Sequence, residues 1–321
     1  MADAFDCIFK FCWHCLIKNP AAICVGWCGY CRIISLSVDK MKPELLIATN
    51  GFQGTWPSIK YGTWLAGVLA TKITLLGVTE KLNPAAIDDH HPLEDIFARA
   101  VELFQQNNVA YSLEVQNGNA QDVISRKAKQ GEYIIVFGPL GRPQIRRIIT
   151  GRSIRHLMEE IEQPILYVPE SKLPLKKILI CIGGLGYEVA AEHIAMQMAI
   201  KSQAEITLLH IVPPIDMNYP TARTVSANWQ NLEDTDTPVG RSLRQALEIA
   251  KSLDLTANVK ARQGHIVEEI LAEVAEGKYD LLCMGSIYST NTLRQLYAPN
   301  VTAEIAEGAT CPVLTARYKK E

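Results

Sequence analysis

The chain has 321 residues, of which 48% are hydrophobic and 21% are charged. This length suits about two domains, and the composition excludes a generally disordered chain. The 32 lysine and arginine residues nearly balance the 34 aspartate and glutamate residues, for a net charge of −2. Non-specific nucleic-acid binders usually carry a basic excess, so nucleic acid is not an expected partner. No uncharged apolar run is long enough to cross a bilayer, so a membrane is not an expected partner either.

Residues 1–41 differ in composition from the rest of the chain. Six of the nine cysteines precede residue 32, and four of them form two C-x2-C pairs, Cys12 with Cys15 and Cys28 with Cys31. Two such pairs can hold zinc tetrahedrally. However, the pairs lack the polar surroundings of a usual zinc ribbon. We therefore treat the four cysteines as weak metal candidates and expect residues 1–41 to be an appendage outside the fold.

The three remaining cysteines stand alone in apolar segments. They are Cys181, Cys283 and Cys311. Single cysteines in such segments are typical of small buried residues in a reducing compartment. A cytoplasmic protein is expected.

The rest of the chain contains an internal repeat. The segment Leu45–Gly51 resembles Ile178–Gly184, and ITLL at Ile73–Leu76 recurs letter for letter at Ile206–Leu209, in both cases 133 residues later. Further matches follow in the same order at offsets of 147 and 148 residues, as one insertion in the second copy would give. We therefore expect two domains of one kind, at 42–170 and 171–321.

Each copy alternates short apolar runs with stretches that have helical periodicity. This alternation predicts an α/β fold with a parallel, doubly wound sheet covered by helices on both faces. The insertion, Pro213–Gly240, is rich in proline, asparagine, aspartate and threonine, and we expect an irregular, mobile loop there. In the first copy, strands are predicted at 45–48, 73–78, 109–115, 134–137 and 165–168, and helices at 58–70, 92–107, 120–131 and 153–161.

Three glycines follow the fourth predicted strand of the first copy. Gly138 and Gly141 come directly after it, and Gly151 precedes Arg152 and Ser153, where a helix is predicted to begin. Glycine lets the backbone approach a ligand closely, and a helix N-terminus attracts phosphate. Ligands of open α/β sheets bind outside the carboxyl ends of the strands. The pattern favours a phosphate-binding loop, with ordinary turn glycines as the alternative.

In these residues the chain resembles the universal stress protein family, in its tandem form. The family motif is Gly-x2-Gly-x9-Gly followed by Ser or Thr, and it leads into a Pro-Val-Leu-like last strand, here Pro164–Val168. The resemblance covers roughly residues 42–318. It implies two Rossmann-like domains of the adenine-nucleotide alpha hydrolase-like type, each with a five-stranded parallel sheet. It also implies that such domains pair through their last strands, within one chain or as a homodimer.

The resemblance further implies a regulatory or binding module rather than an enzyme, with ATP or another adenine nucleotide bound in the first domain. Mg²⁺ could accompany the nucleotide. The alternative is a structural or protein-interaction module in which both sites are lost. The residues that the resemblance assigns to the nucleotide are Thr49, Asn50, Val78, Gly138, Gly141, Gly151, Arg152 and Ser153.

Both copies depart from the family pattern. In the first, Asn50 stands where the family usually has aspartate, and Arg152 precedes the hydroxyl residue. An amide still forms hydrogen bonds, and arginine can contact phosphate. In the second, Gly183 replaces the aspartate and Tyr288 replaces the second glycine, although Gly285 is retained. The second copy is therefore expected to be a non-binding partner domain.

Overall fold

The computed structural model describes residues 43–79, 92–139, 153–214, 224–225, 227–286 and 301–317. Contacts separate Met1–Met41 from a compact unit, Lys42–Glu321, and the described residues all belong to that unit. The finer division at residues 170 and 171 stays a prediction. Below, the first half denotes the described residues through Tyr167, and the second half denotes those from Lys177 onward.

The first half alternates strands and helices as predicted, with boundaries that differ by up to three residues. Most of its strands are apolar on both sides, because they are buried between two helical layers, whereas the strand at 111–117 is only partly buried. The elements are β1 (Glu44–Thr49), η1 (Gln53–Thr55), α3 (Trp56–Leu69), β2 (Ile73–Thr79), α4 (Pro92–Gln106), β3 (Tyr111–Asn117), α5 (Ala120–Ala128), β4 (Tyr133–Phe137), α7 (Ser153–Glu160) and β5 (Ile165–Tyr167).

The second half follows the same order, as its sequence repeat requires. Its elements are β6 (Lys177–Cys181), α8 (Val189–Ser202), β7 (Glu205–Val212), η3 (Trp229–Asp234), α10 (Pro238–Ser252), β8 (Ala257–Gln263), α11 (Ile266–Gly277), β9 (Leu281–Ser286), α12 (Val301–Gly308) and β10 (Val313–Arg317).

All ten strands form one sheet in the order β3-β2-β1-β4-β5-β10-β9-β6-β7-β8. Each half contributes five parallel strands with the same internal order, which confirms the predicted fold class. The halves meet through an antiparallel pair, in which Leu166 of β5 lies opposite Leu314 of β10. The last strands thus pair within one chain, one of the two arrangements that the family resemblance implies.

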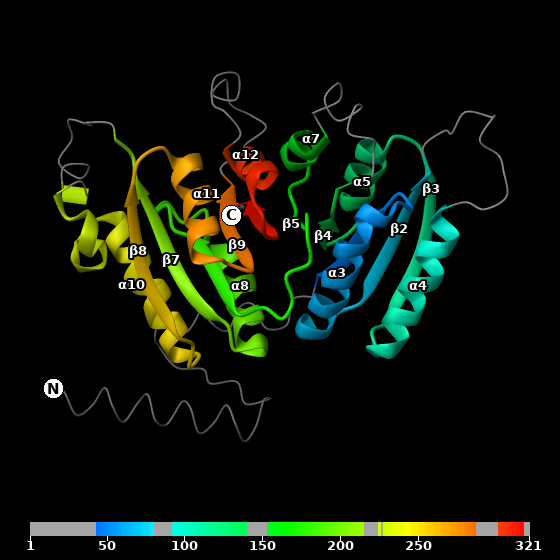
Figure 1. Ribbon diagram of the computed structural model, residues 1–321, viewed down its shortest axis with the longest axis horizontal. Coiled ribbons are helices and arrows are strands. Elements are labelled where there is room, and N and C mark those ends of the chain that lie inside the picture. The colour runs from blue at the N-terminus through cyan, green and yellow to red at the C-terminus, as the bar shows by residue number, and fades with distance from the viewer. Residues whose placement is uncertain are drawn as a thin grey trace, which may run out of the picture. The chain divides into compact units, whose positions relative to one another are not determined.

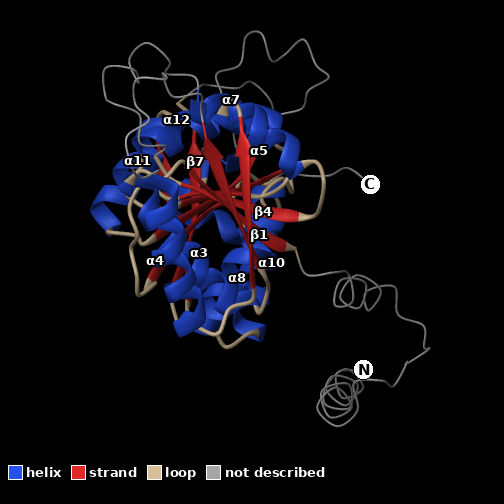
Figure 2. Ribbon diagram, turned by 90° about the vertical axis from the view of Figure 1, so that its right-hand side faces the viewer, coloured by secondary structure: helices blue, strands red, loops and turns tan. Residues whose placement is uncertain are grey.

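Helices cover both faces of this sheet (Figures 1 and 2). Alternate residues of β1 enter the two layers, with Leu45 and Ile47 on one side and Leu46 and Ala48 on the other. The first core receives α3, α4, α8 and α10, and the second receives α5, α7, α11 and α12. Each apolar core therefore runs through both halves. None of the described helices is long and apolar enough to span a membrane.

The prediction of an irregular loop over the whole of Pro213–Gly240 is wrong at its carboxyl end. Leu232 in η3 is fully buried, and α10 already begins at Pro238. The Thr237 hydroxyl caps α10 by accepting a hydrogen bond from the amide of Gly240 at 3.1 Å. Buried threonines thus make local hydrogen bonds here, in a stretch whose polar composition suggested solvent exposure. Residues 215–223 and 226 of this segment lie outside the described residues.

Candidate functional site

The strand order reverses between β1 and β4, so the carboxyl ends of these strands define the candidate site of the first half. Thr49 ends β1 and is fully buried, with its Oγ1 2.6 Å from Oγ1 of Thr55. The same Thr49 oxygen accepts a hydrogen bond from the amide of Gly51 at 3.2 Å. Gly51 has φ of 86°, where glycine is favoured. These contacts fix the turn on which Asn50 stands.

Asn50 lies in this turn, next to Thr49. Its Oδ1 accepts a hydrogen bond from the amide of Phe52 at 3.4 Å. Its side chain therefore helps to shape the turn and also lies at the edge where a ligand would bind. An amide in this position offers both a donor and an acceptor.

Gly138 follows β4 directly and lies against the β1 turn. A Cβ atom at this position would be 2.8 Å from the carbonyl oxygen of Val168 and 3.4 Å from that of Gly54. Because both neighbours are backbone atoms, neither can move aside cheaply. Close packing of three segments therefore accounts for a glycine at residue 138, with or without a ligand.

Val78 and Ser153 complete the described part of the predicted set. Val78 is 2% exposed and its side chain belongs to the core, so only its backbone could meet a ligand. Ser153 begins α7, as predicted. Helix α7 thus presents an N-terminus after the glycine segment. Gly141, Gly151 and Arg152 lie outside the described residues.

The carboxyl end of α7 is held by the other half of the chain. The guanidinium of Arg317 in β10 donates hydrogen bonds to the carbonyl oxygens of Met158 and Glu159, at 2.6 and 2.5 Å. These are carbonyl groups that a helix cannot satisfy internally at its end. His156 forms a pair with Glu160 at 3.1 Å on the same helix, as expected for a helix-face residue. The helix of the candidate site is therefore anchored across the β5–β10 pair.

The equivalent edge of the second half is built differently. Gly183 occupies the position where the family has aspartate, and the amide of Gly184 donates to Oε1 of Glu188 at 3.1 Å. A Cβ on Gly285 would lie 2.5 Å from backbone atoms of Tyr187. The segment before α8 therefore packs directly on the end of β9. Tyr288, whose side chain was expected to close this site, lies outside the described residues.

Two buried carboxyl groups stand at the start of α8, and sequence reasoning missed them. Glu188 and Glu192 are 3% and 6% exposed. Burial, followed by the nearby Glu188 charge, raises the pKa of Glu192 to about 7. Their spacing of four residues places them on one helix face, which is the signal that could have indicated a pair. Both line a cavity of about 30 Å³ between α8 and α10.

Nearby, His210 of β7 is also largely buried. Its Nδ1 lies 2.7 Å from the carbonyl oxygen of Ile182. Burial lowers the pKa of His210, which favours the neutral imidazole. This edge of the second half therefore carries three titratable groups, Glu188, Glu192 and His210.

A pocket of about 380 Å³ lies at the carboxyl ends of β7 and β8. Apolar side chains form much of its wall, and its charged groups are the carboxylates of Glu268 and Glu304. Carboxylates repel phosphate. The carboxylates of this pocket would therefore disfavour a nucleotide's phosphates there.

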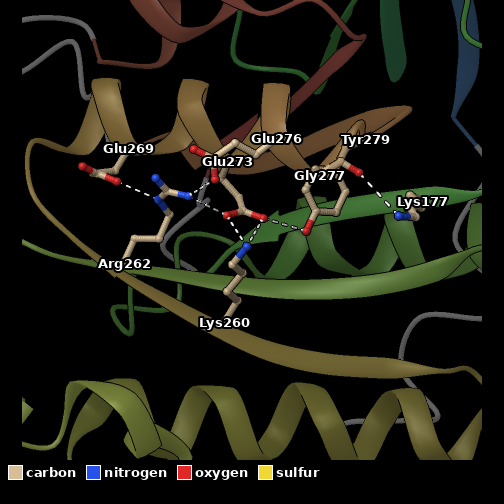
Figure 3. A network of polar contacts seen from close by, with 8 residues as sticks. All are labelled: Lys177, Lys260, Arg262, Glu269, Glu273, Glu276, Gly277 and Tyr279. Atoms are coloured by element: carbon tan, nitrogen blue, oxygen red, sulfur yellow. Dashed lines mark hydrogen bonds and ion pairs between the residues drawn. The ribbon is translucent and has the colours of Figure 1, made fainter.

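The polar cluster shown in Figure 3 involves α11 and is structural in character. The fully buried carboxylate of Glu273 accepts from Lys260, from Arg262 at 3.0 Å and from the hydroxyl of Tyr279 at 3.0 Å. Arg262 also contacts Glu269 at 2.6 Å and Glu276 at 2.7 Å, and these bonds raise its pKa. Burial raises the pKa of Tyr279 to about 12. All the groups are paired with one another, so the cluster ties α11 to β8.

Among the described residues, no three His, Cys, Asp or Glu side chains are grouped so that they could hold a metal ion. The weak zinc candidates Cys12, Cys15, Cys28 and Cys31 lie outside that part. Cys283 and Cys311 are buried with free thiols, as predicted, whereas Cys181 is partly exposed.

Comparison with known proteins agrees with this architecture. Residues 174–317 match the model of the universal stress protein family. A universal stress protein from Synechocystis sp. (strain PCC 6803) is 22% identical over 306 residues, which cover 85% of this chain and 99% of the relative. The crystal structure of a universal stress protein from Archaeoglobus fulgidus DSM 4304 matches with a TM-score of 0.60 at 14% identity, over 86% of this chain and 96% of its own.

A protein of unknown function from Pseudomonas aeruginosa PAO1 matches to a similar degree. Its TM-score is 0.58 at 13% identity, and the match covers 86% of this chain and 92% of that one. At these identities the structures show a shared fold across both halves. The fold expected from the sequence is thereby confirmed.

Proposed function

We propose that this chain is a cytoplasmic stress-response regulator of the universal stress protein family, whose first half binds an adenine nucleotide. The match of residues 174–317 to the family model and the similarity to a universal stress protein along most of the chain support this proposal. The observation that carries this proposal is the meeting of the Thr49–Asn50 turn with Gly138, at the point where the strand order reverses. That is where open α/β sheets bind their ligands.

The residues at this edge have the chemistry that a nucleotide needs. The side chain of Asn50 and the backbone at Val78 would meet the base or ribose. The N-terminus of α7 would favour phosphates, since its free amide groups and dipole attract negative charge. Gly141, Gly151, Arg152 and Ser153 would complete the phosphate side. A Mg²⁺ ion, where present, would arrive with the phosphates and neutralise part of their charge.

The proposed role is binding rather than catalysis. Hydrolysis of a nucleotide needs a positioned base and usually a carboxylate that holds the metal. In the described part of the first half's site, β1 ends at Thr49 and Asn50 follows it in the turn, so this turn offers no carboxylate. We expect no ADP to form faster than in buffer when the protein is incubated with ATP and Mg²⁺.

Isothermal titration of the full chain with ATP tests the proposal directly. One site per chain is expected, and a Gly141→Tyr variant should lose binding, because the side chain would fill the space left for phosphates. The matched control in the second half, Tyr288→Gly, should leave the first site's affinity unchanged. Absence of heat with wild-type protein at millimolar ATP would contradict the proposal.

A binding module that has lost its nucleotide is the second candidate. The packing around Gly138 favours this candidate, because the nearby carbonyl oxygens leave no room for a Cβ there and so explain the glycine without a ligand. This candidate predicts that ATP leaves the melting temperature unchanged. A nucleotide present at about 100 times its dissociation constant would instead add roughly 2.7 kcal/mol to the free energy of unfolding.

A further inference from the structure

Strand β3 forms one end of the ten-stranded sheet, and β8 forms the other (Figure 1). On its outer side, β3 pairs with no strand among the described residues. Two of its aliphatic side chains are unusually open, since Leu113 is 42% exposed and Val115 is 59% exposed. An exposed edge that carries large apolar side chains is a template for pairing with another chain.

In the second half, the equivalent edge strand β8 is covered by other parts of the chain. Leu113 and Val115 correspond to Val259 and Ala261 in β8, since β2 and β7 hold β3 and β8 in the same register. Val259 and Ala261 pack against the core together with Trp229 and Leu232 of η3. The described part of the first half has no counterpart of η3.

Basic side chains stand on β8 but not on β3. Lys260 and Arg262 of β8 are held by carboxylates of α11. Strand β3 has no lysine, arginine or proline. Its one charged residue, Glu114, is neutralised by Lys127 at 2.7 Å. Strand β3 therefore presents two exposed aliphatic side chains, and its one charge is already paired.

We propose that this edge is an interface between two copies of the chain, with the two β3 strands paired antiparallel. A pair centred on Leu113 places Leu113 opposite its own copy and Tyr111 opposite Val115. Glu114 then faces Ser112, so no like charges meet. The surface is thus self-complementary, as a twofold dimer requires. This inference goes beyond nucleotide binding and does not depend on it.

The same fold already extends its sheet in this way. The β5–β10 pair joins two edges antiparallel through three residue pairs. Centred on Leu113, strand β3 aligns its residues Tyr111–Val115 with those of a second copy. A β3–β3 pair would continue the sheet across two molecules by the hydrogen-bonding pattern that joins the halves within one.

Sedimentation equilibrium of the full chain tests the interface. The wild type should approach the mass of two chains as its concentration rises from micromolar to sub-millimolar. The double variant Leu113→Lys/Val115→Lys should raise the dimer dissociation constant at least tenfold, because it places four like charges across the pair. Leu185→Lys serves as the control and should leave the constant unchanged, since Leu185 is 66% exposed but lies in the second half.

Two further measurements guard against misfolding and non-specific aggregation. The single variant Val115→Lys changes the more exposed residue and should weaken the dimer while its circular dichroism matches that of the wild type. Amide hydrogen exchange across Tyr111–Asn117 should slow as wild-type concentration rises. Three outcomes would each overturn the proposal. The wild type could keep the mass of one chain over the whole concentration range, the dimer could survive both lysine variants, or hydrogen exchange in β3 could stay unchanged.

Discussion

The two halves share one fold, but in the ion pair that joins an equivalent strand and helix the two charges have exchanged places. In the first half, Glu114 on β3 meets Lys127 on α5 at 2.7 Å. At the equivalent positions of the second half, Lys260 on β8 meets Glu273 on α11 at the same distance. The sign of each partner is reversed and the pair survives. What the fold requires there is a contact between opposite charges, and either residue order supplies it.

Around this shared pair, the second half has added layers that the first half lacks. Arg262 brings two more carboxylates to the cluster, and η3 covers the face of β8. At the site edge, the second half closes the space by packing Tyr187 onto Gly285. The first half keeps a simpler turn at Thr49 and an open outer strand. The described polar contacts are therefore more extensive around the pair of the second half than around that of the first.

The largest expected effect comes from the buried carboxylate. Glu273→Ala should lower the free energy of unfolding by about 3 kcal/mol, since it leaves Tyr279 and two basic groups without their shared partner. Glu114→Ala, at the partly exposed pair of the first half, should cost less than about 1 kcal/mol. Urea denaturation of both variants measures the contrast. Similar losses of unfolding free energy would show that the two pairs contribute equally to stability. The variant Glu273→Gln keeps the shape of the side chain and removes its charge, so it measures the contribution of the charge alone.

The site glycines give the next contrast. Gly285→Ala should cost about 2 kcal/mol, because its Cβ would lie 2.5 Å from backbone atoms of Tyr187. Gly138→Ala should cost about 1 kcal/mol, because its closest contact is longer, at 2.8 Å. Thermal denaturation of the two variants provides the measurement. If Gly138→Ala abolished ATP binding without loss of stability, glycine would be required at residue 138 for ligand binding rather than for packing.

Stability should also depend on pH through the second half. The folded pKa of Glu192 is about 7, above the ordinary 4.5, so the folded state binds the proton more tightly. This group's contribution is fully present below pH 4.5 and is lost as pH rises through about 7. Glu192→Gln should flatten that part of the profile and be more stable than wild type at pH 8. If the wild type and Glu192→Gln showed identical pH profiles of stability, Glu192 would not be the source of this pH dependence.

The smallest expected effect concerns the anchor between the halves. Arg317→Ala should cost about 1 kcal/mol, because the last carbonyl groups of α7 lose their donor. If α7 holds the nucleotide, the variant should also bind ATP more weakly, whereas Arg317→Lys should recover part of the loss. Calorimetric titration and thermal denaturation on the same preparations separate the two effects. A variant that matches wild type in both would mean that β5 and β10 alone fix α7.

The sequence predicted the strands well where burial left a continuous apolar run, as at β1 and β4. It failed at residues 229–240, because Leu232 and Val239 stand singly among polar residues whose hydrogen bonds are local and buried. For the site, glycine spacing located the edge and the first residue of α7. It could not show that Gly138 is needed for packing or that Glu188 and Glu192 are buried, since carboxylates on one helix face are usually solvated.

The antiparallel β5–β10 pair has a consequence for how the protein can change over generations. In a homodimer, every substitution occurs twice, so neither partner can lose a site that the other must keep. Here the partners are parts of one chain, and their effective concentration does not fall on dilution. Each half is free to drift alone. The tandem arrangement therefore lets the two halves diverge, as Asn50 and Gly183 at equivalent positions already do.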